Sequence, residues 1–594
     1  MKTQKDLEAY LFHEGTNYNA QEYLGGHKEG GLYVFRVWAP NAEKVFLTGD
    51  FNGWDESIRL HKITLGGVWE TSVDEKRINA GQKYKYKIYG RSGASFKADP
   101  YATRTEKMPE TASVIPNDCE YIWHDKGWLD FRRKMAANYY GLPMNVYELH
   151  LSSFRRHKDG TPFDYTELAR ELAPYVKQMG YTHVQIMPIA EYPYDASWGY
   201  QICSFFAPTA RYGSTEQFKG FVDKMHEAGV GVILDWSLSG FPKDEHGLYR
   251  FDGDALYERT DISTEGIERF DFSRNEVRSF LISSALYWLR EFHIDALRIG
   301  GLSSVIHGGG AEFIKTLNYC IKNEFCDVLT IAELSDPFAK TTGFDNGGLG
   351  FDIKWDMEWT DRTLRYAGLD GAQRATEFEC LASPTVYAFG ERRMLPISHD
   401  EVVHGRRSFL DKMSGDYWQK FAGARAVLGY MMTYPAKKLN FMGYEIGHFR
   451  EWDYDGEVEW FLLEYQTHAK FQRFVAELNH FYLSEPSLWQ NDASTDGFVR
   501  IETETNSGVI SYKRVASDNS SLTVAINLSL DRYEGALRGD IERGEYEELF
   551  NSDDERFGGK GEINPGALLC DDDRGGGSLR IRLAPLAFTV IKKK

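Results

Sequence analysis

The sequence IDALRIGGLSSV, residues 294–305, decides the fold of this chain. It begins as a strand in which apolar residues alternate with Asp295 and Arg298, and it ends at the pair Gly300–Gly301. Arg298 and Gly300 are two positions apart, so they face the same side of the strand. Because Gly300 brings no side chain, Arg298 is the only one of the two that can reach a ligand on that side.

An amphipathic helix is predicted immediately before this strand. Ser273 and Glu276 have the spacing of a capping box, which marks the beginning of a helix. The apolar residues on one face of this helix are Val277, Phe280, Leu281, Trp288 and Phe292. A helix that leads into a strand with a special loop at its end is the repeating unit of an α/β barrel, in which chemistry takes place at the strand ends.

The same alternation of strands and helices extends over the middle of the chain. The predicted strands are NVYELHL (145–151), HVQIMPI (183–189), VGVILDW (230–236), DALRI (295–299), VLTIAE (328–333), GFDIKW (350–355), MLPISH (394–399) and KLNFM (438–442). Helices are predicted between them, for example at 167–179 and 214–228. Strands that alternate with helices over this length indicate a parallel sheet closed as a barrel.

Segments with a two-residue period flank this region on both sides. From Gly30 to about Pro116, and again after about Pro486, apolar and polar residues alternate between turn residues, as in a β-sandwich. The run CDDDRGGGS (570–578) is predicted as a solvated loop. The predicted fold class is α/β, with a helical lead-in (1–25), an N-terminal β-sandwich (26–116), a central (β/α)8 TIM barrel (117–486) and a C-terminal β-sandwich (487–594).

The amino-acid composition limits which ligands and which cellular location we expect. The formal net charge of −19 opposes binding to a nucleic-acid backbone and is compatible with a neutral substrate. The N-terminal sequence has no apolar signal core, and no apolar run is long enough for a bilayer, so we expect a cytoplasmic protein without membrane contact. The 6 cysteines include no CxxC pair, which predicts reduced thiols. The spacing of potential ligands predicts no metal, and no cofactor is predicted.

Polar residues stand at the ends of four predicted barrel strands. These residues are Asp235, Arg298, Glu333, and His399 with Asp400. Barrel geometry brings the ends of successive strands to one rim, so we expect these side chains to converge. Carboxylates that converge with an arginine and a histidine, without clustered metal ligands, indicate acid–base chemistry on a glycosidic bond.

Six sequence blocks carry a resemblance to a known family. They are SWGYQ (197–201), GVILDW (231–236), DALRI (295–299), TIAELS (330–335), LPISHDEVVHG (395–405) and FMGYEIGHFREW (441–452). In this order they resemble the signature blocks of glycoside hydrolase family 13, and more narrowly those of the bacterial 1,4-α-glucan (glycogen) branching enzymes. The front β domain, with FRVWAPNA and GDFNGW, is similar to carbohydrate-binding module family 48. The resemblance covers nearly the whole chain.

The resemblance implies a role for each matching residue. Glu333 corresponds to the general acid/base, and Asp400 to the carboxylate that stabilises the transition state. The implied substrate-binding residues are Tyr200, Trp198, Asp235, Arg298 and His399. Among them, Tyr200 corresponds to the platform for the sugar ring, and Arg298 to the residue that orients the nucleophile. The implied ligand is an α-glucan, such as glycogen, amylose or a maltooligosaccharide.

The chain departs from the family pattern at the catalytic positions. The family nucleophile is an Asp two residues after the Arg of DALR, and here this residue is Gly300. A His that the family has five residues after the Asp of the DW block is Gly240 here. Smaller departures are Tyr192, Leu334 and Tyr444, and a shortened segment VIHGGGAEF (305–313). Retaining transfer needs a carboxylate that forms the glycosyl-enzyme intermediate, and Gly300 cannot supply one.

The sequence therefore supports three hypotheses about function. The first is a branching-enzyme homologue that has lost the transferase reaction of glycogen biosynthesis, a pseudoenzyme with a glucan- or partner-binding role. The second is an active branching enzyme or weak α-glucan hydrolase that recruits a surrogate nucleophile, with Glu333 as acid/base. The third is a regulatory subunit of an active paralogue. The first predicts glucan affinity without turnover, and the third predicts co-purification with an active enzyme.

Overall fold

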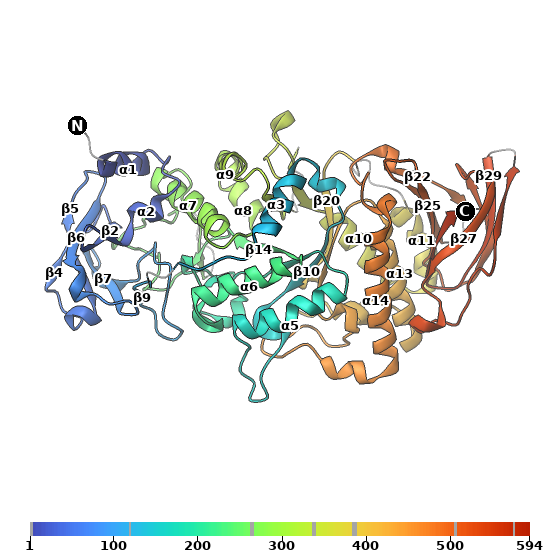
Figure 1. The fold of residues 1–594 in the computed structure, drawn as a ribbon, viewed down its shortest axis with the longest axis horizontal. Coiled ribbons are helices and arrows are strands. Elements are labelled where there is room, and N and C mark those ends of the chain that lie inside the picture. The colour runs from blue at the N-terminus through green and yellow to red at the C-terminus, as the bar shows by residue number, and fades with distance from the viewer. Residues whose placement is uncertain are drawn as a thin grey trace.

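The computed structural model describes residues 4–117, 120–261, 266–334, 340–382, 389–503, 508–573 and 576–594. Figure 1 shows three parts in a row along the long axis: N-terminal β-sheets, a central part with helices around a barrel, and C-terminal β-strands. The predicted order of β, α/β and β parts is confirmed.

A closed barrel of parallel strands forms the centre of the molecule. Among the described residues its strands are β10 (Asn145–Leu149), β11 (His183–Ile186), β14 (Gly231–Ser237), β17 (Ala296–Gly300), β18 (Leu329–Ala332), β19 (Ile353–Trp355), β20 (Arg393–Ile397) and β21 (Lys437–Phe441). They neighbour one another in chain order, and each overlaps a predicted strand and extends at most one residue beyond it. Their apolar runs are buried on both faces, as is usual for parallel sheets between helices. The predicted (β/α)8 barrel is confirmed.

Helices surround the barrel and link its strands. The described helices of this part are α3 (Lys126–Met135), α4 (Leu151–Phe154), α5 (Tyr165–Gln178), α6 (Thr215–Glu227), α7 (Asn275–Glu291), α8 (Leu302–His307), α9 (Ala311–Glu324), α10 (Met357–Ala367), α11 (Gly371–Ala382), α12 (Phe409–Lys412), α13 (Tyr417–Thr433) and α14 (Gln466–Ser484). Helices α5 and α6 correspond to the predictions at 167–179 and 214–228, and each begins with a capping box.

The capping box predicted for α7 is wrong. The helix begins at Asn275 without a side-chain cap. The Ser273 hydroxyl donates a hydrogen bond to Asp271, and the Glu276 carboxylate lies 2.8 Å from Nδ1 of His13. His13 belongs to the N-terminal helix that packs on α7, so a tertiary contact replaces the local one.

The N-terminal part contains two short helices and two antiparallel sheets. The helices are α1 (Gln4–His13) and α2 (Ala20–Tyr23). One sheet contains β1 (Gly25–Glu29), β2 (Leu32–Trp38), β6 (Val68–Asp74) and β5 (His61–Lys62); the other contains β4 (Ile58–Arg59), β3 (Lys44–Gly49), β7 (Lys83–Gly90), β8 (Gly93–Lys97) and β9 (Ser113–Val114). In β7 the side chains of Tyr84, Tyr86 and Ile88 are buried, as the alternation with lysines predicts. These sheets form the predicted N-terminal sandwich.

The C-terminal part is a single path of hydrogen-bonded strands. In the described residues the order is β22 (Phe498–Arg500), β24 (Val509–Val515), β25 (Ser521–Asn527), β30 (Ala587–Lys593), β27 (Gly544–Asn551), β28 (Leu568–Asp573), β29 (Gly576–Leu583), β26 (Tyr533–Gly539) and β23 (Glu502–Thr503). The path folds over, because one core cluster contains Val509 and Ala525 together with Leu537 and Leu579. The solvated loop predicted at 570–578 is wrong: β28 and β29 pair there, and residues 574–575 lie outside the described part.

A buried ion cluster joins the barrel to the C-terminal strands. The carboxylate of Asp492 contacts Nζ of Lys437 on β21 at 2.9 Å and the guanidinium of Arg514 on β24 at 2.7 Å. All three side chains are buried, so each charge depends on the others for its solvation.

The structure also bears on the predictions about reduced thiols and membrane contact. Cys203, Cys320, Cys326 and Cys570 are free thiols, while Cys119 and the side chain of Cys380 lie outside the described residues. None of the helices in the described ranges combines the length and hydrophobicity that a bilayer crossing requires.

Candidate active site

The predicted site residues come together at the carboxyl ends of the barrel strands. Asp235 lies on β14, Arg298 and Gly300 lie on β17, Glu333 follows β18, His399 and Asp400 follow β20, and Trp198 and Tyr200 lie in the loop before β13 (Ser204–Pro208). The parallel register aligns Asp235 with Arg298 and Ser237 with Gly300. The convergence expected from barrel topology is therefore present.

Arg298 bridges two carboxylates in the floor of the site. Its Nη1 donates to both oxygens of Asp235 at 2.8 and 2.7 Å, and its Nη2 lies 2.8 Å from Oε2 of Glu333. The guanidinium also stacks 4.3 Å above the ring of Trp355. Burial opposes its charge, but Asp235 and Glu333 raise the pKa of Arg298, so the guanidinium stays protonated.

The space beside Gly300 is occupied by this arginine. A Cβ built on Gly300 would stand 2.8 Å from Nη1 of Arg298 and 3.2 Å from Oε2 of Glu333. A positive group thus lies where a side chain of residue 300 would begin. The nearness of Glu333 also means that a carboxylate at position 300 could reach the spacing of about 5 Å that retaining enzymes use.

Glu333 has the environment of a proton donor. Burial raises the pKa of its carboxyl group, Arg298 opposes this rise, and the negative charge of Asp400 adds to it. A raised pKa keeps a carboxyl group protonated closer to neutral pH, as a general acid requires.

His399 is held in the charged form by two carboxylates. Its Nδ1 lies 2.9 Å from Oε1 of Glu148, and its Nε2 lies 3.4 Å from Oδ1 of Asp400. Burial opposes the charge, but Glu148 and Asp400 raise the pKa of His399 to about 9. Glu148, on β10, was missed in the sequence because a lone acidic residue inside NVYELHL has no distinctive spacing.

Aromatic rings form a wall next to these charges. The ring of Tyr200 stacks on His399 with centroids 5.7 Å apart, and its hydroxyl donates to Asp235 at 2.6 Å. Trp198 contacts Trp452 edge-on at 5.0 Å and stacks on His404 at 5.4 Å. Trp452 was not predicted as a site residue, although it ends the quoted block 441–452. Flat apolar rings beside charged groups suit a sugar, which has an apolar face and polar hydroxyls.

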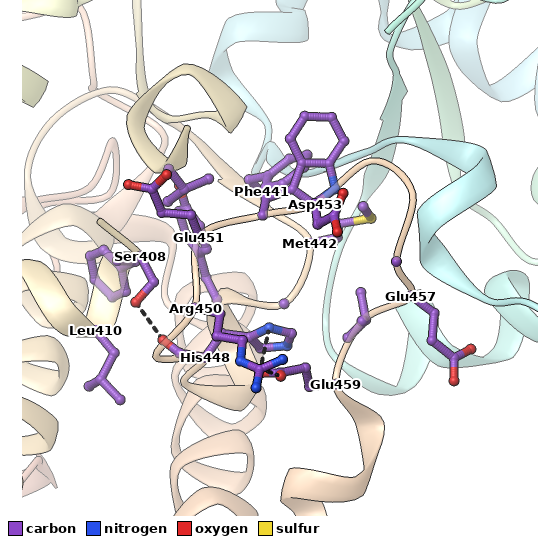
Figure 2. A pocket seen from close by; sticks show the side chains of 17 residues that line it. Ser408, Leu410, Phe441, Met442, His448, Arg450, Glu451, Asp453, Glu457 and Glu459 are labelled. Atoms are coloured by element: carbon purple, nitrogen blue, oxygen red, sulfur yellow. Dashed lines mark hydrogen bonds and ion pairs between the residues drawn. The ribbon is translucent and has the colours of Figure 1, made fainter. Parts of the chain in front are cut away.

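A pocket adjoins this wall at Trp452. Its volume is about 160 Å³, and Phe441, Tyr444 and Trp452 are among the residues that line it. Figure 2 shows His448, Arg450 and Glu459 grouped at its lower edge. Burial lowers the pKa of His448 to about 4, so this imidazole is neutral.

Gly240 is enclosed by backbone and leaves no empty subsite. It precedes β15 (Phe241–Pro242), which pairs antiparallel with β16 (Ile267–Glu268), and its φ is +139°. A Cβ there would stand 2.1 Å from the carbonyl oxygen of Glu268. An imidazole cannot be added at this position without moving β16, because the backbone of a paired strand is less free to move than a side chain.

The residues at the smaller departures from the family pattern pack inside the protein. Tyr192 lies under the guanidinium of Arg211 at 3.9 Å, Leu334 is buried, and Tyr444 donates to the carbonyl oxygen of Ser398 at 2.8 Å. All three side chains are buried, and the two tyrosines have polar partners within the protein.

A possible metal-ligand group lies away from the rim. His124, Asp223 and Glu227 place one ligand atom each within 4.8 Å of the others. Nδ1 of His124 already lies 2.8 Å from Asp223, and His124 and Glu227 are exposed. The three residues form a partly exposed ion cluster around the buried Asp223, and we assign no metal to it.

Family models match all three parts of the chain. Residues 19–102 match carbohydrate-binding module 48 (isoamylase N-terminal domain), residues 152–249 match the α-amylase catalytic domain, and residues 501–594 match the α-amylase C-terminal all-β domain. The chain is 43% identical to the 1,4-α-glucan branching enzyme GlgB of Desulfitobacterium hafniense, over 100% of this chain and 99% of the relative. The chain belongs to the 1,4-α-glucan branching enzyme family.

A second relative agrees with this assignment, and a more distant solved structure shares the fold. The branching enzyme GlgB of Halothermothrix orenii is 42% identical over 100% of this chain and 99% of its own length. The structure of a pullulanase from Bacillus acidopullulyticus shares the fold, with a TM-score of 0.70, 16% identity, and coverage of 96% of this chain and 75% of the pullulanase. The predicted resemblance to branching enzymes is confirmed.

Proposed function

We propose that this member of the branching-enzyme family binds α-glucan and has lost the retaining transfer reaction. One observation carries the proposal: position 300 has no carboxylate, and the guanidinium of Arg298 takes its place while it bridges Asp235 and Glu333. A retaining reaction forms a covalent bond between the sugar and a carboxylate of the enzyme. An arginine cannot make that bond.

Glucan binding does not depend on the missing nucleophile. Tyr200 with His399, and Trp198 with Trp452, offer rings at the rim, and Asp400 offers a carboxylate that is 39% exposed. The net charge of −19 does not repel a neutral polysaccharide. In this proposal Glu333 keeps the environment of the acid/base, and Asp400 and His399 hold sugar hydroxyls.

A branching assay tests the proposal directly. The purified protein is incubated with amylose, and new α-1,6 linkages are measured by debranching and chain-length analysis. Glu333→Gln, prepared in the same way, reports contaminating activity. We expect equal, background levels from both proteins, together with retained affinity for maltooligosaccharides. Turnover by the wild type that is absent from Glu333→Gln would overturn the proposal.

A second candidate keeps enzymatic activity. The raised pKa of Glu333 and the intact pairing of His399 with Glu148 and Asp400 favour it, because they preserve the acid side of the reaction. Glu333 and Asp400 would then act as an inverting pair, which requires a separation of about 6.5–9.5 Å. Hydrolysis of maltooligosaccharides followed by NMR distinguishes this candidate, because an inverting reaction releases the β-anomer first.

A further inference from the structure

A pocket near the candidate site is lined mainly by basic side chains. Its volume is about 410 Å³, which lies within the range of ligand-binding pockets. The charged residues that line this basic pocket are Arg365, Arg406, Arg407 and Lys412, with Asp361 and Glu401. Four cations against two carboxylates run counter to the whole chain, whose net charge is −19. The basic pocket therefore concentrates positive charge on a protein that otherwise repels anions.

Segments from three parts of the barrel domain meet at the basic pocket. Helix α10 contributes Asp361 and Arg365, which are one helical turn apart and share a face. Helix α12 contributes Lys412, and the segment after β20 contributes Glu401. Glu401 directly follows Asp400 of the candidate site in the chain. A ligand in the basic pocket would thus lie against the segment that also carries Asp400.

Arg407 offers a guanidinium that is not used by the protein. Within the described ranges its side chain has no polar partner, while its backbone N–H donates to Oε1 of Glu451 at 2.6 Å. The N–H of Gly405 donates to Oε2 of the same carboxylate at 3.1 Å. Arg407 has a φ of +68° and His404 a φ of +57°, values that side chains rarely allow and that occur at ligand clamps. Glu451 therefore fixes a strained loop that presents an unpaired arginine.

The other cations of the basic pocket also keep donors for a ligand. Nη1 of Arg406 lies 3.4 Å from Glu401, and Nη2 of Arg365 lies 3.3 Å from Glu377. Nζ of Lys412 donates to the carbonyl oxygen of Arg406 at 2.6 Å. A guanidinium and an ammonium each have several N–H groups, so none of these side chains is saturated by such contacts. Burial raises the pKa of Glu401, which weakens the opposition of this carboxyl group to an anion.

We propose that the basic pocket binds a phosphate monoester, which is carried either by a free sugar phosphate or by a phosphorylated glucan chain. A phosphate monoester has a charge of about −1.5 to −2 at neutral pH and several acceptor oxygens. The planar fork of an arginine matches such a group, and a carboxylate would neutralise only part of the surplus charge. The inference goes beyond the proposed loss of transfer, because no residue of the basic pocket enters that argument.

The test is isothermal titration calorimetry with glucose 6-phosphate, at constant ionic strength because salt screens exposed charges. We expect saturable binding that inorganic phosphate displaces and glucose does not. Arg407→Gln should weaken the binding by about 10-fold or more, since a hydrogen bond to a charged group contributes about that much. The matched control is Arg133→Gln, which removes an arginine that is 70% exposed on α3, outside the basic pocket, and it should bind as the wild type.

A second titration distinguishes the two sources of the phosphate. It compares maltotetraose that carries a 6-phosphate group with plain maltotetraose and with glucose 6-phosphate. Tighter binding of the phosphorylated chain than of either comparison ligand would support the glucan source. Binding no tighter than that of glucose 6-phosphate would support a free sugar phosphate.

Two results would overturn the inference. One is the absence of saturable binding of glucose 6-phosphate and of inorganic phosphate to folded wild-type protein. The other is an equal loss of affinity in Arg133→Gln and Arg407→Gln, because the attraction would then come from the general surface charge. Thermal unfolding establishes that both variants are folded. The branching assay measures a different reaction, so this inference and the proposed function fail separately.

Discussion

Replacing Gly300 with aspartate should restore branching activity. The Cβ of the new side chain begins 3.2 Å from Oε2 of Glu333, which allows the two carboxyl groups to reach the spacing of about 5–5.5 Å in retaining enzymes. Arg298 must move, because its Nη1 is 2.8 Å from that Cβ. The atom that must move is the far end of a flexible side chain, and the new carboxylate gives it a partner.

The expected increase in branching rate is the benefit of the regained nucleophile minus the cost of crowding Arg298. Loss of a nucleophile that acts together with other groups costs about 10⁴ to 10⁶ in rate. This range corresponds to about 5 to 8 kcal/mol of transition-state stabilisation. Crowding around Arg298 removes about 1–3 kcal/mol of it, as for other insertions into packed sites. An increase of about 10²-fold or more over the wild type should remain.

The assay measures α-1,6 linkages formed from amylose, with the double variant that also carries Glu333→Gln as the blank. Gly127→Asp controls for an added surface aspartate. Thermal unfolding establishes that Gly300→Asp is folded. A folded Gly300→Asp protein with no linkages above the blank would refute the reasoning, since the remaining residues would then be insufficient for catalysis.

Three further substitutions test the geometry. Gly240→Ala should destabilise the protein by about 2 kcal/mol or more, because it adds a Cβ at a φ of +139° and 2.1 Å from a carbonyl oxygen; an unchanged urea midpoint would contradict this. Glu148→Gln should lower the pKa of His399 from about 9, which NMR titration of the imidazole measures. Because the folded-state pKa of His399 is raised, the stabilisation of the folded protein is complete below about pH 6.5 and is lost as the pH rises through 9. It amounts to about 3 kcal/mol, and Asp400 supplies part of it, so Glu148→Gln should lose less stability over this range than the wild type. Asp492→Ala should cost about 3–5 kcal/mol in chemical unfolding, because it leaves two buried cations without their carboxylate, and a cost under about 1 kcal/mol would exclude this.

The sequence by itself determined the architecture and most of the residues that meet at the site, although not Glu148 or Trp452. The eight barrel strands are short apolar runs between helices, and such runs have few alternatives to a buried parallel sheet. Once the barrel is predicted, its topology brings Asp235, Arg298, Glu333 and Asp400 to one rim without any knowledge of side-chain packing. The absence of a carboxylate at residue 300 is likewise a property of the chain alone.

Only the tertiary structure decided how these groups interact. The sequence indicates that Gly300 lacks a side chain, but not that Arg298 fills the space and binds Glu333. It predicts a cap at Glu276, yet this carboxylate faces His13, which is 263 positions away. The hydrophobic periodicity of strands and helices is a local property of a few neighbouring residues. The partner of a buried charge depends on how segments that are distant in the sequence pack together. The sequence therefore determined which strand ends meet, and the packing decided which charges pair and which space is filled.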